Sequence, residues 1–144
     1  MGLKKWLFAE GPVDDATIAA TEQLFQVTFP QDYKDCVKKF NGGYPEPNNF
    51  DYDNGAQGVF NDLISFTNSE LNITMFREFA QDSLTKGIIP FGRDPFGNLL
   101  GFDYRFNKEI PLIIFFDHEE IEEEAITPVC DTFTELLDKL YSIE

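Results

Sequence analysis

Three short apolar runs follow one another in the second half of the chain and restrict its fold more than any other feature. They are IIPFG (residues 88–92), NLLGFDYR (98–105) and PLIIFFDH (111–118). Each is rich in aliphatic and aromatic residues, and turn-forming residue types separate them, as expected for β-strands. Sequential strands with tight connections predict an antiparallel meander. EAITPVC (124–130) is a candidate fourth strand, in which Pro128 marks a sheet edge or the end of pairing.

Helical periodicity appears on both sides of these runs. The segment QDYKDCVKKF (31–40) follows Pro30 and places apolar residues at helical spacing, and DTFTELLDKLYS (131–142) does so most clearly, with Asp131 as its expected N-cap. Another helix is predicted to begin at Asp14-Asp15, which can cap its N-terminus, and to run with a ragged apolar pattern through Ile18, Leu24 and Phe25. Because strands are central and no strand-helix-strand alternation occurs, the fold class is predicted to be α+β, with a central mainly antiparallel sheet flanked by helices.

The region between the second helix and the meander is less regular. Asn41-Gly42-Gly43 can adopt positive φ and is expected to end the helix. The prolines of YPEPNNF predict an exposed loop or a short edge strand up to about Asn54, whereas GVFNDLISF (58–66) is expected to be a strand and ITMFREFAQ (73–81) a short helix. A phosphate-binding loop would need these glycines before a helix N-terminus, so they are interpreted as a helix stop.

The length of 144 residues suits one domain, which we expect to span residues 1–144 without disulfides or a metal for stability. Cys36 and Cys130 lie in apolar patterns and are expected to be buried thiols, which suits a reducing cytosol. No apolar run is long enough for a membrane span, and the N-terminal apolar stretch is too short for a secretory signal. The expected location is therefore the cytoplasm.

The formal net charge of −15 arises from 26 acidic and 11 basic side chains. Such a field repels nucleic acid and anionic lipid and attracts cationic partners. The segment DHEEIEEE (117–124) contains six carboxylates in eight residues. It could be a solvated edge that prevents sheet-to-sheet aggregation, or a docking surface for a basic protein.

Aromatic residues after the helix stop are candidate interface anchors, although they could equally fold back on the core. Together with the acidic positions they form the set that we expect to bind a partner. This set consists of Tyr44, Phe50, Asp51, Tyr52, Asp94, Asp117, Glu119, Glu120, Glu122, Glu123 and Glu124.

Candidates for catalysis are few. His118 is the only histidine and could act as a base or metal ligand, but a histidine among charges at a strand end is usually a solvated turn residue. Four aspartates, at positions 51, 53, 94 and 103, could gather a cation, yet DYDNG lacks the glutamate that ends a calcium loop. We therefore expect no catalytic residue, cofactor or metal.

Several segments taken in order resemble the SUKH superfamily, which includes the fungal Smi/Knr-type cell-wall regulators and many bacterial toxin-immunity proteins. The resemblance begins at Ile18 with Glu22 and continues through FPQDYKDCVKKFNGG, IIPFGRDPFGNLLGFDYR, PLIIFFDHE and DTFTELLDKL. Each motif is weak alone, but their order and spacing span most of the chain. No long disordered extension is evident, so the chain is most similar to compact bacterial members.

The resemblance implies an α+β fold, no enzymatic activity and a role in protein binding. Bacterial members neutralise a cognate toxin, often a secreted or contact-dependent nuclease, and do not share one set of functional side chains. We therefore expect an immunity protein whose acidic surface binds a basic nuclease toxin. Two alternatives stay open, namely an interaction module in cell-envelope regulation and a hydrolase that uses carboxylates with His118 or a divalent ion.

Overall fold

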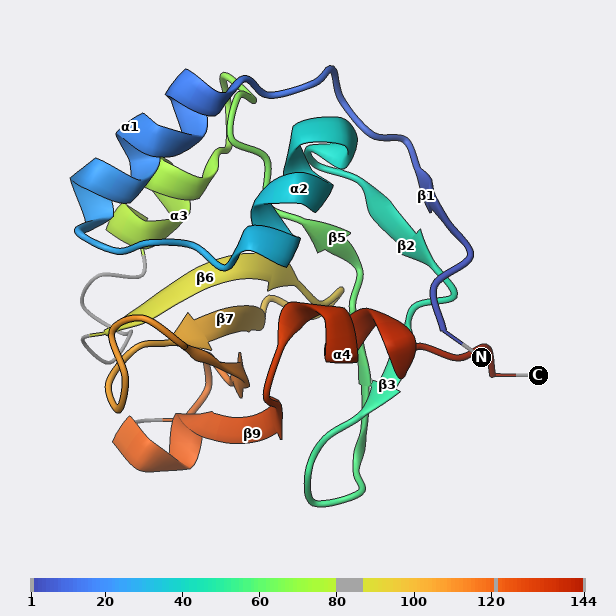
Figure 1. Cartoon of the computed structure of the whole chain (residues 1–144). Helices are drawn as coiled ribbons and strands as arrows, with labels where there is room; N and C mark the ends of the chain where they lie inside the picture. The colour runs from blue at the N-terminus through green and yellow to red at the C-terminus, as the bar shows by residue number, and fades with distance from the viewer. Residues whose placement is uncertain (1, 80–86, 121, 144) are drawn as a thin grey trace.

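The central feature of the computed structural model is a five-stranded antiparallel sheet with the strand order β5-β6-β7-β8-β9 (Figure 1). The structure describes residues 2–79, 87–120 and 122–143. The strands are β5 (Asp62–Leu63), β6 (Ile88–Arg93), β7 (Leu99–Asp103), β8 (Leu112–Phe116) and β9 (Ile126–Cys130). The predicted meander is confirmed, and β9, which contains Pro128, lies at one edge of the sheet.

Four further short strands form two ribbons beside this sheet. β1 (Lys5–Leu7) pairs with β2 (Tyr44–Glu46), and β3 (Asn49–Asp51) pairs with β4 (Gln57–Val59). The expected strand 58–66 is thus divided between β4 and β5. The division falls at Phe60, whose side chain is buried. Its amide donates to Asn48 O and takes no part in the hydrogen bonding of either strand.

The helices are α1 (Asp15–Phe25), α2 (Gln31–Phe40), α3 (Ile73–Phe79) and α4 (Phe133–Asp138), with a 3₁₀ turn η1 (Glu122–Ala125). The Asp14 cap of α1 is confirmed, since its carboxylate accepts from the amide of Thr17 at 2.8 Å. Leu24, expected on the apolar face of α1, is exposed instead. Gly42 adopts φ +71° after α2, as the helix stop required. The last two residues of the predicted helix 73–81 lie outside the described residues.

The C-terminal helix differs from its prediction at both ends. Its N-cap is Thr132, whose side chain accepts from the Glu135 amide, and not the expected Asp131. The helix also ends at Asp138, short of the predicted position. Tyr141 instead exchanges two backbone hydrogen bonds with Asn49, at 2.8 and 3.1 Å, which requires an extended backbone.

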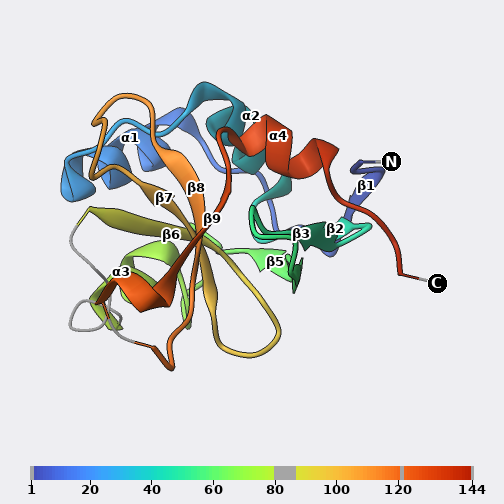
Figure 2. The same cartoon turned by 90° about the horizontal axis from the view of Figure 1, so that it is seen from below.

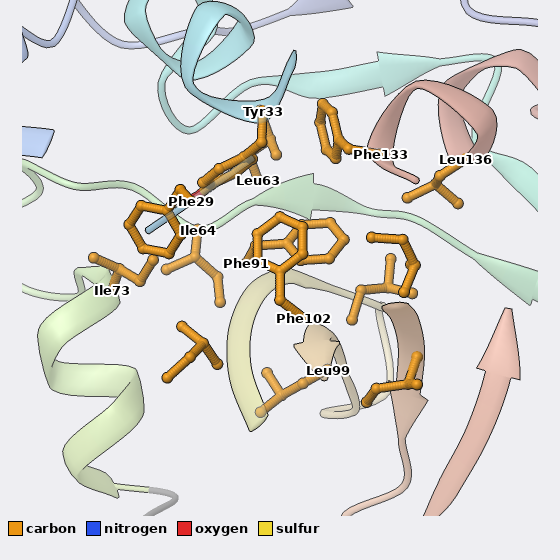
Figure 3. Close-up of a cluster of buried hydrophobic side chains, with 14 of the residues drawn as sticks. Phe29, Tyr33, Leu63, Ile64, Ile73, Phe91, Leu99, Phe102, Phe133 and Leu136 are labelled. Atoms are coloured by element: carbon orange, nitrogen blue, oxygen red, sulfur yellow. The ribbon is translucent and has the colours of Figure 1, made fainter. Parts of the chain in front are cut away.

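The hydrophobic core lies between the sheet and helices α2 and α4 (Figures 2 and 3). Tyr33 of α2 is fully buried at its centre, where its ring lies 4.9 Å from that of Phe102 and 5.3 Å from that of Phe133. Phe102 in turn stacks on Phe91 at 4.5 Å. Perpendicular and offset ring pairs of this kind add to the free energy gained by burying aromatic surface.

Helices α1 and α3 lie together beside β6 (Figure 1). The N-terminal segment packs against the end of α4, where the Gly2 amide donates to Leu140 O at 2.8 Å. Cys36 and Cys130 are free, half-buried thiols, and burial raises the pKa of each to about 12. Within the described residues, no helix has the length and apolar character that a membrane crossing requires.

Candidate functional site

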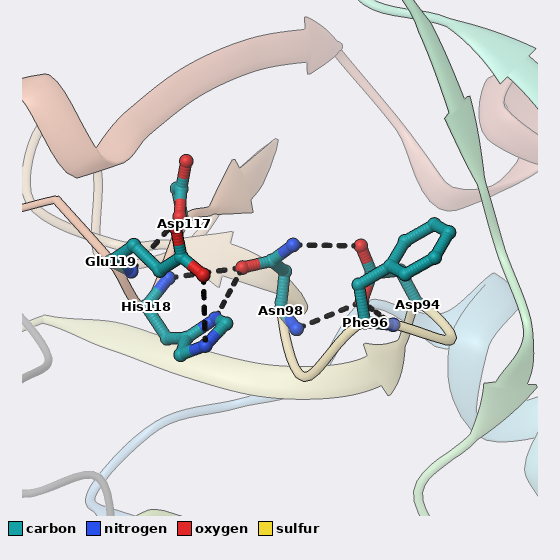
Figure 4. A network of polar contacts seen from close by, with 6 residues as sticks. All are labelled: Asp94, Phe96, Asn98, Asp117, His118 and Glu119. Carbon is teal, nitrogen blue, oxygen red and sulfur yellow. Dashed lines mark hydrogen bonds and ion pairs between the residues drawn. The ribbon is translucent and has the colours of Figure 1, made fainter.

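The acidic segment that follows β8 lies against the β6–β7 turn. Leu99, the first residue of β7, pairs with Phe116, the last residue of β8, so the two chain segments meet at the same end of the sheet. There the Oδ1 atom of Asn98 accepts from the backbone amide of His118 at 3.1 Å and lies 2.6 Å from its Nδ1 (Figure 4). We call residues 94–98 and 117–120 the acidic edge.

Asp94 organises the turn from within. Its Oδ1 accepts from the amides of Phe96 and Asn98, both at 2.8 Å, and its Oδ2 accepts from the Asn98 side chain at 2.8 Å (Figure 4). The residue is buried, so this carboxylate, predicted to bind a partner, holds the turn together instead. The same geometry leaves the Phe96 side chain 72% exposed at the turn. Phe96 is absent from the set of residues that the sequence predicted to bind a partner. Its place between Pro95 and Gly97 in a turn could have indicated that its side chain is exposed.

The remaining carboxylates of the acidic edge are exposed or partly exposed to solvent. Glu119 and Glu120 are exposed, and Asp117 is half-buried with its Oδ1 accepting from the Glu119 amide at 2.9 Å. Among the described side chains, no lysine or arginine lies within ion-pair distance of these three residues. The Nε2 atom of His118 lies 3.9 Å from Glu119 Oε1, a contact that is an ion pair only when His118 is protonated.

Part of the β3–β4 ribbon contributes to the same electrostatic environment. The ring of Tyr52 lies 4.9 Å from that of Phe115. Burial, and to a smaller extent the negative charges of Asp94 and Asp117, together raise the pKa of Tyr52 to about 12. The charges of Asp94 and Asp117 thus act on Tyr52, so these three predicted residues share one electrostatic environment.

Other predicted residues lie elsewhere. Phe50 is fully buried and offers no surface to a partner, because its ring packs into the core from β3. Asp51 is exposed and accepts from the Tyr141 hydroxyl at 2.7 Å. Tyr44 lies on β2, where its ring is perpendicular to that of Phe8. Glu124 is exposed beside the acidic edge, whereas the side chains of Glu122 and Glu123 lie outside what the structure describes.

Several of the residues considered for metal binding or acid-base chemistry are engaged by neighbouring groups. Within the described residues, no group of three His, Cys, Asp or Glu side chains is placed to hold a metal ion. Of the four aspartates considered, Asp103 is bound by Arg105 through two contacts of 2.9 Å and Asp94 by the turn. His118 contacts an amide oxygen and one carboxylate, which is a surface hydrogen-bonding pattern.

Comparison with known proteins agrees with the fold. The SMI1 / KNR4 family (SUKH-1) model matches residues 12–139, from the approach to α1 to the end of α4. A search of curated proteins found no match. The match covers all of the described helices and the whole central sheet, as the resemblance in the sequence implied. The chain therefore belongs to the SMI1 / KNR4 family, SUKH-1.

Proposed function

We propose that this chain is an immunity-type binding protein that neutralises a basic nuclease toxin through its acidic edge. The single observation that carries the proposal is the group of solvent-facing carboxylates at Asp117, Glu119 and Glu120, which have no lysine or arginine partner among the described residues. Family membership is consistent with such a role. The proposed action is occlusion: the protein covers the toxin surface and performs no chemistry on it.

Electrostatics explains why such an edge suits this partner. A nuclease binds a polyanion through a surface rich in Lys and Arg. A cluster of carboxylates presents a similar field to that surface, so it accelerates association and disfavours acidic partners. The exposed Phe96 ring supplies apolar area beside the charges, and aromatic side chains often carry much of the binding free energy at interfaces.

The experiment uses a candidate nuclease toxin chosen from the genes that neighbour the gene for this chain. The two proteins are coexpressed, growth is scored, and the dissociation constant is measured at two salt concentrations. We expect the chain to restore growth and the affinity to fall as salt increases.

Paired variants locate the surface. The double variant Glu119→Lys/Glu120→Lys is expected to weaken binding at least tenfold, mainly through slower association. The control Asp35→Lys/Asp138→Lys makes the same change in net charge on exposed residues of α2 and α4 and should change affinity by less than about threefold. Equal weakening by both variants would contradict the assignment to the acidic edge.

The two alternatives make different predictions in the same experiment. If protection fails and a host protein is captured in place of a basic toxin, toxin neutralisation is excluded and envelope regulation gains support. If His118→Ala or a chelator abolishes protection while the measured affinity is unchanged, binding alone does not explain protection and the hydrolase alternative gains support.

A further inference from the structure

A cavity of about 420 Å³ lies between the N-terminal segment, β5 and α3, away from the residues of the acidic edge. We propose that this cavity binds an arginine side chain of a protein partner. The inference rests on the proposed function only in taking the partner to be a basic protein.

Aromatic rings form two walls of the cavity. Phe8 is 81% exposed and adopts φ +55°, a left-handed conformation that is sterically unfavourable for a phenylalanine. Its ring lies 5.9 Å from that of Tyr44, at 86°. Phe76 of α3 lines the cavity as well. An exposed aromatic ring held in a strained conformation at a cavity is a feature that ligand binding explains and core packing does not.

The charge of the cavity is negative. Among the described residues, its lining includes Glu10, Asp62 and Glu70 against a single cation, Arg93. The buried Asp62 carboxylate is bound by the Arg93 guanidinium through both of its oxygens. These two charges compensate each other, so Glu10 and Glu70 remain to attract a cation.

Buried polar groups fix the position of the Glu10 carboxylate. Its Oε1 accepts from the Ser65 hydroxyl at 2.8 Å, and its backbone amide donates to Asn41 O at 2.8 Å. Asn41 is fully buried and donates to Ser65 Oγ at 3.3 Å. A Cβ atom at Gly42 would lie only 2.8 Å from Oε2, so glycine is needed for the carboxylate to rest there. A carboxylate that is held in place loses little entropy when it binds a ligand.

Arginine fits these walls better than lysine. A guanidinium is planar, stacks on aromatic rings, pairs with a carboxylate through two hydrogen bonds and is weakly hydrated. Its methylene stem can pack on Leu63, Ile64 and Leu71, which also line the cavity. Arg93 already shows this combination within the chain, because its guanidinium carbon lies 5.5 Å from the centre of the Phe76 ring while it binds Asp62.

The cavity and the acidic edge belong to one continuous surface. Phe76 and Arg93 also line a second cavity of about 300 Å³, and Asp94 and Asn98 line its other side. Asn98 then contacts His118 of the acidic edge. A basic protein seated on the acidic edge could therefore extend a loop along this surface and insert an arginine beside Glu10.

The test requires no toxin. N-acetyl-L-arginine amide is titrated into isotopically labelled protein, and backbone amide shifts are followed by NMR, with N-acetyl-L-citrulline amide as the neutral analogue of the same shape. We expect saturable shifts at Glu10, Gly42 and Ser65 with the arginine compound and at least fivefold weaker binding of the citrulline compound. N-acetyl-L-lysine amide should bind more weakly than the arginine compound as well.

Two variants and a matched control complete the test. Glu10→Gln retains an acceptor for Ser65, and Phe8→Ala removes an exposed ring, so neither is expected to unfold the chain; dispersed amide spectra verify this. Each should weaken arginine binding at least fivefold, whereas Glu120→Gln, with the same charge change as Glu10→Gln, should not. Equal binding of the citrulline compound, shifts confined to the acidic edge, or equal effects of Glu10→Gln and Glu120→Gln would overturn the inference.

The outcomes separate this inference from the proposed function. If the arginine compound binds as expected but the chain fails to protect against the toxin, the cavity assignment stands and the toxin proposal fails. If the chain protects and the arginine compound does not bind, the cavity assignment fails and the proposal for the acidic edge stands.

Discussion

At the scale of single residues, two buried tyrosines differ in whether their hydroxyl groups are hydrogen-bonded. The Tyr33 hydroxyl is buried and has no hydrogen-bond partner among the described residues. The Tyr104 hydroxyl donates to Thr28 O at 2.9 Å. Burial raises the pKa of both tyrosines well above the usual range. The unfavourable desolvation of the hydroxyl is therefore offset by a hydrogen bond at only one of the two positions.

These tyrosines provide a matched pair of substitutions. Tyr33→Phe removes a desolvated hydroxyl without losing a bond, so we expect the free energy of unfolding to stay unchanged or to rise by up to about 1 kcal/mol. Tyr104→Phe should lower it by about 1 kcal/mol, because the Thr28 carbonyl loses its donor. Urea unfolding followed by tryptophan fluorescence measures both. A loss of stability in Tyr33→Phe as large as in Tyr104→Phe would show that the Tyr33 hydroxyl does have a partner.

At the scale of single elements, α4 depends on its first turn. The helix spans only Phe133–Asp138, which is too short to be stable by itself, so its cap and its buried face must hold it. Thr132 accepts from the Glu135 amide at 3.0 Å, while Phe133 and Leu136 are buried against the core. The cap and these two apolar residues thus stabilise the same helical turn.

The identity of the cap can be tested directly. Thr132→Ala removes the acceptor for the Glu135 amide and is expected to lower the free energy of unfolding by about 1 kcal/mol. Asp131→Ala, at the cap position that the sequence predicted, should change it by less than about 0.5 kcal/mol, the usual range for surface positions. Both values come from denaturant unfolding with a common m-value. A larger loss of stability in Asp131→Ala than in Thr132→Ala would show that Asp131 is the N-cap, as the sequence predicted.

At the scale of the whole molecule, the net charge of −15 opposes folding because the compact state brings like charges together. Added NaCl screens this repulsion, with a Debye length that falls from about 30 Å at 0.01 M to about 10 Å at 0.1 M. We expect the melting temperature to rise by a few degrees over this range, as measured by differential scanning calorimetry.

A variant checks the source of that salt effect. Glu119→Gln/Glu120→Gln should raise the melting temperature at 0.01 M salt and reduce its dependence on NaCl, because these carboxylates have no lysine or arginine partner among the described residues. A melting temperature that is independent of salt in the parent protein would show that the surface charges are already compensated.

The sequence by itself determined the meander, the approximate positions of the four helices and the acidic segment. Strand and helix periodicity are local properties, so runs such as PLIIFFDH and QDYKDCVKKF specify their own elements. Charge is also additive along a chain and needs no fold to be counted. These local features explain why the family resemblance is visible in the sequence alone.

Only the tertiary structure decided which side chains reach the surface and which meet. Phe50 and Tyr44 stand six residues apart in similar sequence surroundings, yet one is buried in the core and the other lines a cavity. Asp94 stabilises a turn because its carboxylate accepts hydrogen bonds from two backbone amides and from the Asn98 side chain. The cavity beside Glu10 joins segments more than fifty residues apart, and the packing that assembles it depends on long-range contacts that no local pattern encodes.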